Sequence, residues 1–124
     1  MKSRTVLSII KVIKVSESAL ILFCKYPQPG AVKTRLAKDT SDSFACDIYK
    51  LMVQDILAIS KADGYERRIF VGSHPLEFTK MFNLREKVFI QRGENLGERI
   101  KNSFADCKID GFKKIIIIGS DIPL

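Results

Sequence analysis

A segment that combines cations with proline and glycine, residues 25–38 (KYPQPGAVKTRLAK), has the composition of an anion-binding loop. Its four cations, with no acidic residue among them, are Lys25, Lys33, Arg35 and Lys38. Backbone N–H groups around Gly30 would bind phosphate oxygens directionally, and the cations would neutralise their charge. The spacing fits neither the G-x-x-x-x-G-K-S/T phosphate loop nor the G-x-G-x-x-G dinucleotide turn. A solvated basic loop stiffened by its prolines is the alternative, and the local charge excess favours the anion site.

A second segment, residues 91–99 (QRGENLGER), combines a turn with the start of a helix. Gly93 permits the turn, Asn95 is placed to cap the following helix, and Glu98 stands three residues after that cap. Turn and capping chemistry explain these residues without a ligand. Because Gln91 leaves a predicted strand on the side of the sheet where ligands bind, contact with a ligand is an equally good interpretation.

The third segment, residues 119–124 (GSDIPL), places Asp121 shortly after four consecutive isoleucines. A carboxylate at the exit of a buried strand is a common place to hold Mg²⁺ or Mn²⁺ against a diphosphate. One carboxylate alone is a weak metal signal, so phosphate oxygens bound by residues 25–38 would have to complete the site. An aspartate in a turn, assisted by Pro123, is the alternative.

Alternating strands and helices would position these three segments. Short, almost wholly apolar runs predict buried strands, while Pro27, Pro29 and Gly30 exclude a helix and predict a loop over the segment KYPQPGAVKTRL. The predicted strands cover residues 19–24, 68–72, 87–91 and 114–118, and the predicted helices cover residues from about 41 to 62, 76–82 and 95–107. Such alternation is typical of an α/β fold with a mostly parallel sheet, in which ligand loops follow the carboxyl ends of the strands.

The longest predicted helix has several candidate caps and one candidate core face. Thr40, Ser41, Asp42 or Ser43 would cap its start, and Gly64 would end it. Helical spacing predicts a core face made of Ala45, Ile48, Tyr49, Met52, Ile56 and Ile59.

Composition restricts the classes of protein to which this chain of 124 residues can belong. Its length suits one domain, and 46% hydrophobic with 28% charged residues is an ordinary globular balance. Three scattered cysteines argue against a disulfide framework or a zinc finger and favour a reducing, cytoplasmic location. The net charge of +7 comes from residues 1–16 and 25–38, each with four cations and no acid, so we expect no nucleic-acid partner.

The first 18 residues form an extension before the predicted nucleotide-binding domain of residues 19–124. Lys11 and Lys14 interrupt its apolar stretch, which is too short to span a bilayer, and no small-residue cleavage site follows. We therefore expect neither membrane insertion nor export. One face of a basic amphipathic helix would carry Val6, Ile9, Ile10 and Ile13. A strand or helix that covers apolar surface of the domain is the favoured interpretation.

Three motifs of this chain, in this order, resemble those of the DUF2064 family, also described as arsenosugar-biosynthesis type glycosyltransferases. They are residues 19–36 (ALILFCKYPQPGAVKTRL), 91–100 (QRGENLGERI) and 118–124 (IGSDIPL). The resemblance implies a Rossmann-like sheet and the amino-terminal half of a GT-A nucleotide-diphospho-sugar transferase fold, since family members continue beyond the third motif. More distantly, the chain is similar to phospholactate guanylyltransferases and molybdenum-cofactor nucleotidyltransferases.

The resemblance also implies roles for individual residues. The diphosphate of a nucleoside diphosphate sugar would be bound by the K-x-P-x-x-G-x-V-K-T-R-L element, which supplies Lys25, Gly30, Lys33, Thr34 and Arg35. The N-L-G-E-R element is matched by Asn95, Leu96, Gly97, Glu98 and Arg99. Asn95 and Gly97 of that element would contribute to nucleotide binding, and Gln91 would approach the nucleotide. Asp121 would be the catalytic residue, as the ligand of Mg²⁺ or Mn²⁺.

The implied activity is metal-assisted glycosyl transfer to a small-molecule acceptor that the motifs do not identify. Nucleotidyl transfer and non-catalytic nucleotide binding are the alternatives. In the GT-A pattern residues 114–118 pair with the first strand and leave an apolar edge. Because such edges attract other strands, we expect association with a second copy or with another polypeptide.

Overall fold

Four parallel strands form one sheet, in the order β3-β2-β1-β4, in the computed structural model, which describes residues 17–119. The strands are β1 (Ser18–Cys24), β2 (Glu66–Val71), β3 (Val88–Ile90) and β4 (Lys114–Gly119). The helices between them are α2 (Thr34–Asp39), α3 (Asp42–Ile59), α4 (Pro75–Met81) and α5 (Leu96–Ile109). The α/β class and the parallel sheet predicted from the sequence are confirmed.

The apolar character of β1 follows from its place inside the sheet. β1 pairs with β2 on one side and with β4 on the other, so that Leu22 stands opposite both Ile69 and Ile118. Ile21 and Leu22, which point to opposite faces, are both fully buried. A strand enclosed in this way needs apolar side chains on both faces, which is why the run from Ala19 to Cys24 shows no alternation.

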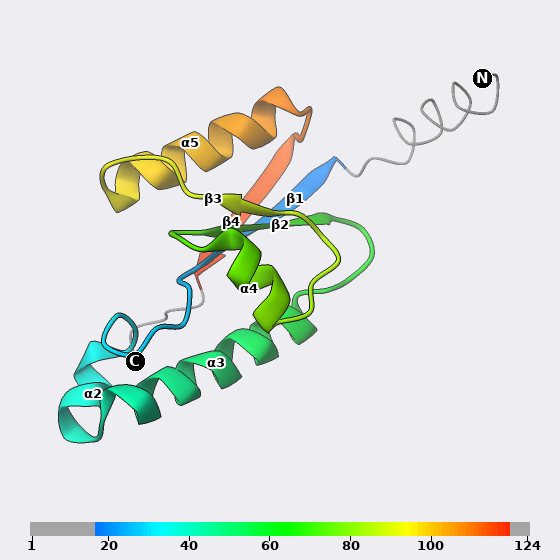
Figure 1. The fold of residues 1–124 in the computed structure, drawn as a ribbon. Coiled ribbons are helices and arrows are strands. Elements are labelled where there is room, and N and C mark those ends of the chain that lie inside the picture. Colours follow the sequence, from blue (N-terminus) through cyan, green and yellow to red (C-terminus); the bar gives the residue numbers. More distant parts are fainter. Residues whose placement is uncertain (1–16, 120–124) are drawn as a thin grey trace.

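Helices cover the two faces of the sheet unequally (Figure 1). α3 and α4 lie on one face, where Tyr49 and Phe78 pack against Leu22 and its neighbours. Of the helices within residues 17–119, α5 covers the other face, where Cys107 packs with Ile21 and Phe23. This distribution follows from right-handed crossovers, because the chain moves across the sheet in one direction from β1 to β3 and returns to reach β4.

Two predicted helix starts are confirmed as side-chain caps. Ser41 Oγ accepts a hydrogen bond from Phe44 N at 3.0 Å and begins α3. Asn95 Oδ1 accepts one from Glu98 N at 2.9 Å and begins α5. Each cap satisfies a backbone donor that has no partner within its helix.

The core face predicted for the longest helix is partly wrong. Ala45 and Tyr49 are fully buried as expected, but Ile59 is 79% exposed. Val53 and Leu57 are buried instead, so the stripe that faces the sheet is rotated toward them. The helix also ends at Ile59, before the predicted end near residue 62, and the stretch that includes Gly64 lies in the turn before β2.

The loop predicted over residues 25–36 is shorter than expected. Residues 25–33 are irregular, as Pro27, Pro29 and Gly30 require, but the short helix α2 begins at Thr34. Lys33, which precedes it, has a left-handed backbone with φ of 49°. The prolines and the glycine therefore restrict only the residues around themselves, and the chain becomes helical four residues after Gly30.

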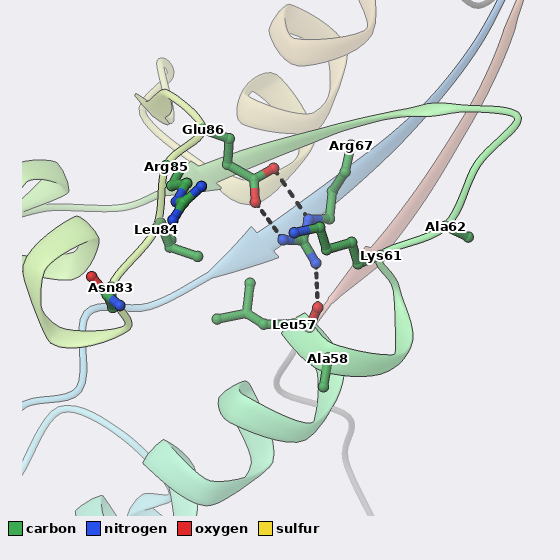
Figure 2. Close-up of a pocket in the computed structure, with 9 residues that line it drawn as sticks. All are labelled: Leu57, Ala58, Lys61, Ala62, Arg67, Asn83, Leu84, Arg85 and Glu86. Carbon is green, nitrogen blue, oxygen red and sulfur yellow. Dashed lines mark hydrogen bonds and ion pairs between the residues drawn. The ribbon is translucent and has the colours of Figure 1, made fainter.

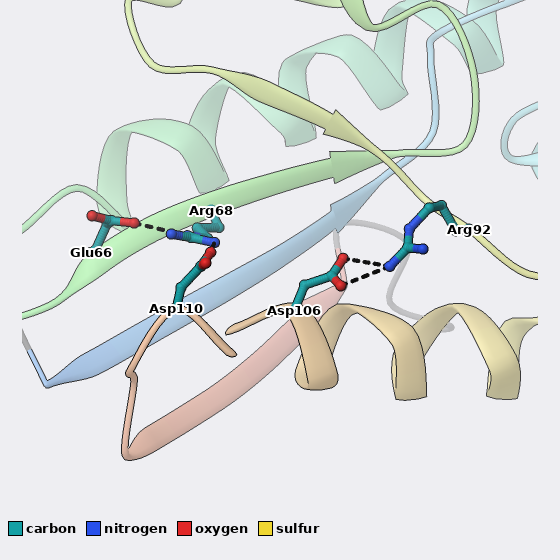
Figure 3. A network of polar contacts seen from close by, with 5 residues as sticks. All are labelled: Glu66, Arg68, Arg92, Asp106 and Asp110. Atoms are coloured by element: carbon teal, nitrogen blue, oxygen red, sulfur yellow. Dashed lines mark hydrogen bonds and ion pairs between the residues drawn. The ribbon is translucent and has the colours of Figure 1, made fainter. Parts of the chain in front are cut away.

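Arg68 of β2 ties the end of α5 to the sheet (Figure 3). Its guanidinium pairs with Glu66 at 2.8 Å and with Asp110, and it lies over the rings of Phe89 and Phe112. Burial lowers the pKa of Arg68, but the hydrogen bonds from the two carboxylates outweigh that effect and raise it above its ordinary value. This cluster is structural, because its charges are paired with one another.

The predicted extension of residues 1–18 overlaps the first strand, because β1 begins at Ser18. Residues 1–16 of that extension and Asp121 of the third motif lie outside the described residues. Within residues 17–119, no helix is long and apolar enough to cross a membrane.

Candidate functional site

The strand order changes direction at the boundary between the neighbouring strands β1 and β4. From β1 the chain proceeds to β2 and β3 on one side, whereas β4 lies on the other side of β1. At such a switch point, the connections that leave neighbouring strands diverge to opposite faces and open a crevice beyond the carboxyl ends. The basic segment begins at this point, because Lys25 directly follows β1.

The basic segment is anchored to the core by its apolar residues. Val32 is 1% exposed and belongs to the core cluster on the α3 face, and Pro27 is buried. Lys25 N donates a hydrogen bond to the hydroxyl of Tyr49 at 2.8 Å, which fixes the exit from β1 on α3. The segment is thus held at both ends of its irregular part.

A tight turn in the middle of this segment depends on glycine. Ala31 N donates to Gln28 O at 3.0 Å, and Gly30 within the turn has φ of 85°. That backbone conformation favours glycine. A Cβ at Gly30 would lie 3.6 Å from Asp42 Oδ2, so the first turn of α3 lies close by.

The predicted cations of this segment occupy different environments. Lys25 and Arg35 are exposed, and Lys33 is half-buried. Thr34 and Arg35 form the first turn of α2, and both are exposed. Lys25 directly follows β1, and Gly30, Lys33, Thr34 and Arg35 lie in the stretch that leads from it into α2. Binding of an anion by these residues stays a prediction.

Gln91 connects the ends of three strands. It follows β3, and its Nε2 donates to Phe70 O at 3.1 Å and to Cys24 O at 3.2 Å. Its backbone N–H donates to Val71 O at 2.8 Å. The side chain thus reaches across β2 to the end of β1 and positions the loop after β3 against the start of the basic segment.

Arg99 joins this arrangement from the first turns of α5. Its Nε donates to Gly93 O at 3.0 Å, and its Nη1 donates to Gln91 Oε1 at 3.4 Å. A Cβ at Gly72, just after β2, would lie 3.5 Å from Arg99 Nη1, so the guanidinium lies next to the end of β2. Arg99 is the arginine of the N-L-G-E-R element, but the sequence alone gives it no role, because that role depends on which acceptors surround its guanidinium.

Asn95 and Gly97 lie at the start of α5. Asn95 is exposed and uses its side-chain oxygen as the helix cap, and a Cβ at Gly97 would lie 3.3 Å from that same oxygen. Glu98 Oε2 accepts from Glu94 N at 2.9 Å. The turn and cap interpretation of this segment is therefore confirmed, and a contact of Asn95 or Gly97 with a ligand stays a prediction.

An aromatic pair also stands at this end of the sheet. The rings of Tyr26, after β1, and His74, after β2, stack with centroids 4.8 Å apart and an interplanar angle of 28°. His74 has a left-handed backbone with φ of 54° and is exposed, and its Nδ1 lies 2.9 Å from Ser73 Oγ. Non-glycine residues in this conformation are uncommon and often lie at functional sites.

Metal ligation cannot be assembled from the described part of the chain alone. Among residues 17–119, no group of three or more His, Cys, Asp or Glu side chains could hold a metal ion. β4 ends at Gly119, whose partner in the sheet is Phe23 near the end of β1. Asp121, the predicted ligand, lies beyond the described residues.

A pocket of about 470 Å³ lies at the opposite end of the sheet, where β2 begins (Figure 2). Arg67 reaches across it, with Glu86 on one side and Leu57 O and Ser60 Oγ of the α3 terminus on the other. The carboxyl end of α3 carries partial negative charge, which Arg67 and the nearby Lys61 compensate. The charged side chains of this pocket therefore stabilise the fold by pairing with Glu86 and with the end of α3. The pocket is remote from the basic segment.

Comparison with known proteins agrees with the fold. The model of the DUF2064 family, described as an uncharacterized protein conserved in bacteria, matches residues 55–124. No curated protein matches the chain. Among solved structures, the chain is similar to a "putative nucleotide-diphospho-sugar transferase" from Desulfovibrio desulfuricans G20, with a TM-score of 0.81 and 32% sequence identity. The match covers 88% of this chain and 49% of the other, so this chain spans about half the length of that protein.

Proposed function

This chain belongs to the DUF2064 family, and we propose that it binds a nucleoside diphosphate sugar at the carboxyl end of β1 and supports transfer of the sugar to a small acceptor. The observation that carries the proposal is the position of the basic segment. It begins at the switch point of a parallel sheet, where α/β proteins bind nucleotides. The name of the similar solved structure, which has the same fold, supports the ligand class.

The chemistry of sugar transfer fits the charges that the segment provides. When the bond between the sugar and the diphosphate breaks, negative charge develops on the departing phosphate oxygens. Lys33 and Arg35, held after the glycine turn and at the start of α2, would stabilise that charge. Burial of Val32 anchors the backbone from which both side chains extend, which would limit the movement needed as the charge appears.

A divalent metal belongs to the proposal, with Asp121 as its protein ligand. Mg²⁺ or Mn²⁺ prefers oxygen ligands and commonly keeps phosphate oxygens among them. A metal at Asp121 would therefore take most of its ligands from the diphosphate, water and residues outside the described range. When bound, it would act as a Lewis acid toward the leaving diphosphate.

A ligand screen by thermal unfolding tests the binding proposal. Uridine and guanosine diphosphate sugars, the free diphosphates and the triphosphates are each added with and without Mn²⁺. A ligand at about 100 times its Kd stabilises the folded state by about 2.7 kcal/mol, so a binding nucleotide raises the Tm measurably. No rise in Tm with any nucleotide at millimolar concentration contradicts the proposal.

Two further measurements separate glycosyl transfer from its alternatives. Consumption of a nucleoside diphosphate sugar supports glycosyl transfer, whereas consumption of a triphosphate with release of pyrophosphate supports nucleotidyl transfer. Binding without turnover of either supports a nucleotide-binding domain.

The variant Asp121→Asn tests the metal: we expect Mn²⁺ to strengthen diphosphate binding to the parent chain and not to the variant. An equal effect of Mn²⁺ on both would assign Asp121 to a turn only.

A further inference from the structure

We propose that Arg99 is a phosphate-binding residue that contacts the ligand from the α5 side of the site, opposite the basic segment. The identity of the ligand rests on the proposed function, but the anion site itself does not. The proposal rests on three observations: the partners of the guanidinium, its burial, and its connection to the end of β1.

The guanidinium of Arg99 has N–H donors that no acceptor within residues 17–119 uses. An arginine side chain carries five N–H donors, and here the Nε donor and one Nη1 donor bind Gly93 O and Gln91 Oε1. Both acceptors are neutral, so they fix the direction of the side chain without compensating its charge. The remaining N–H groups include both donors of Nη2, which hydrogen-bonds to no atom of the described chain.

Other arginines of the described chain show what a structural role looks like here. Arg67, Arg68 and Arg92 each pair with at least one carboxylate. Arg35 and Arg85 lack a carboxylate partner within residues 17–119, but both are exposed to solvent. Within that range, Arg99 alone is partly buried and without a carboxylate. Removing a cation partly from water without an anion costs free energy, and an anionic ligand would recover it.

The position of Arg99 connects it to the basic segment. Gln91 Oε1 accepts from Arg99 while Gln91 Nε2 donates to Cys24 O, so two hydrogen bonds lead from the guanidinium to the residue before Lys25. Two glycines lie next to Arg99. A Cβ at Gly72 would be in van der Waals contact with the guanidinium, 3.5 Å from Nη1, and one at Gly93 would overlap the backbone of α5, 2.8 Å from Arg99 N.

Phosphate is the ligand chemistry that matches these features. A guanidinium presents N–H groups in a planar fork that binds two oxygens of a phosphate at once. The basic segment supplies cations from the α3 side, and Arg99 supplies one from α5. A diphosphate bound at the end of β1 would then be held from both faces of the sheet.

Titration calorimetry on the full chain tests this inference, with inorganic pyrophosphate, UDP and GDP as probes. Four variants are compared: Arg99→Gln, Arg99→Lys, Arg92→Gln and Arg92→Lys. Arg92 is the matched control, because it is exposed and pairs with Asp106 on the surface of α5 at 2.7 Å (Figure 3). We expect Arg99→Gln to weaken each binding probe about tenfold or more and Arg92→Gln to change affinity less than about twofold.

The lysine variants allow the test to be read even if Arg99→Gln does not fold. Arg99→Lys retains the charge and loses the fork, so we expect an intermediate loss, about threefold or more, with no loss in Arg92→Lys. Raising the salt concentration should weaken the parent more than Arg99→Gln, an effect that a purely structural role would not produce.

The outcomes separate this inference from the proposed function. Equal affinities of Arg99→Gln and the parent overturn the role of Arg99 and leave the proposed function intact, as do equal losses in the Arg99 and Arg92 variants. Arg99-dependent binding of pyrophosphate with no binding of UDP or GDP supports the anion site and contradicts the proposed function. A parent chain that binds none of the probes overturns both.

Discussion

Lys33 and Arg35 stand two residues apart, yet their backbones differ. Lys33 is half-buried in a left-handed conformation, and Arg35 is exposed in the first turn of α2. We expect Lys33→Ala and Arg35→Ala each to weaken nucleoside diphosphate binding about tenfold or more, because each removes a charged hydrogen bond worth about 1.5–3 kcal/mol. Calorimetry measures the affinities, and Lys101→Ala, which removes an exposed cation from α5, is the control. Affinities equal to the parent's would remove the phosphate role of the residue concerned.

Gly93 is the position at which a single methyl group should do most damage to the site. Its φ is 144°, and an added Cβ would lie 2.8 Å from both Arg99 N and Glu98 Cβ. We expect Gly93→Ala to lower the free energy of unfolding by roughly 1–3 kcal/mol, since strain and overlap act together. Gly119→Ala is the matched control, because a Cβ there meets nothing within 4 Å. Urea unfolding of the two variants with similar midpoints would contradict the expectation.

The residue types of the site could be predicted, but their contacts could not. The cations of residues 25–38 are visible as a local charge excess, and the segment that carries them begins directly after β1. The importance of Arg99 depends on which acceptors surround its guanidinium, and that follows from the packing of α5 over the sheet. Likewise, the hydrogen bond from Gln91 to Cys24 O joins residues 67 positions apart in the chain, which the sequence does not show.

At the scale of elements, α5 depends on its first residue. Asn95 Oδ1 accepts from Glu98 N, and the helix it begins carries Arg99. We expect Asn95→Ala to lower the free energy of unfolding by about 0.5–2 kcal/mol, because a backbone donor loses its partner. Asn95→Asp should retain most of the stability, since aspartate caps equally well and its charge suits a helix start. If denaturant unfolding shows Asn95→Asp to be as unstable as Asn95→Ala, the cap is not the reason for asparagine here.

Prediction of the elements succeeded where composition is one-sided and failed where tertiary contacts decide. The apolar run of β1 follows from burial on both faces, whereas β4 carries a similar run although Ile116 is 64% exposed. α2 was missed because the prolines and the glycine dominate the pattern, although they act only on residues 25–33. The predicted core face of α3 differs from the observed one because the helix carries apolar residues on more than one side. Val53 and Leu57 pack against the sheet, and Ile59 does not.

At the scale of the whole molecule, the cysteines report on the cooperativity of the fold. Cys24 and Cys46 are each 2% exposed, and Cys107 is 0% exposed. Burial raises the pKa of the Cys46 and Cys107 thiols, so the reactive thiolate is scarcer at neutral pH. We expect a thiol reagent to modify none of the three rapidly in the native protein and all three in denaturant. Absorbance measurement of the released thiolate counts them, and rapid labelling of any one in the native state would show local opening.

β4 is an edge strand of the sheet, because among the described residues it pairs only with β1. Ile116 is 64% exposed and Ile118 is 38% exposed, both on the face of Leu22 where α3 and α4 do not cover them. An apolar edge strand with unpaired backbone groups attracts a second strand. We propose that two copies of this chain of 124 residues associate through β4, because an antiparallel pair of identical edges satisfies both sets of backbone groups at once.

Light scattering after size exclusion tests this association. We expect a mass of twice the 14.0 kDa of the single chain, shifting to the single-chain mass in Ile116→Lys, which puts a charge on the edge. Ile109→Lys is the matched control, because Ile109 is 82% exposed at the end of α5 and lies off the sheet. A single-chain mass in the parent that persists after deletion of residues 1–16 contradicts the proposal. Association that appears only after that deletion instead indicates that the amino-terminal segment covers β4, because the edge then becomes available only when that segment is removed.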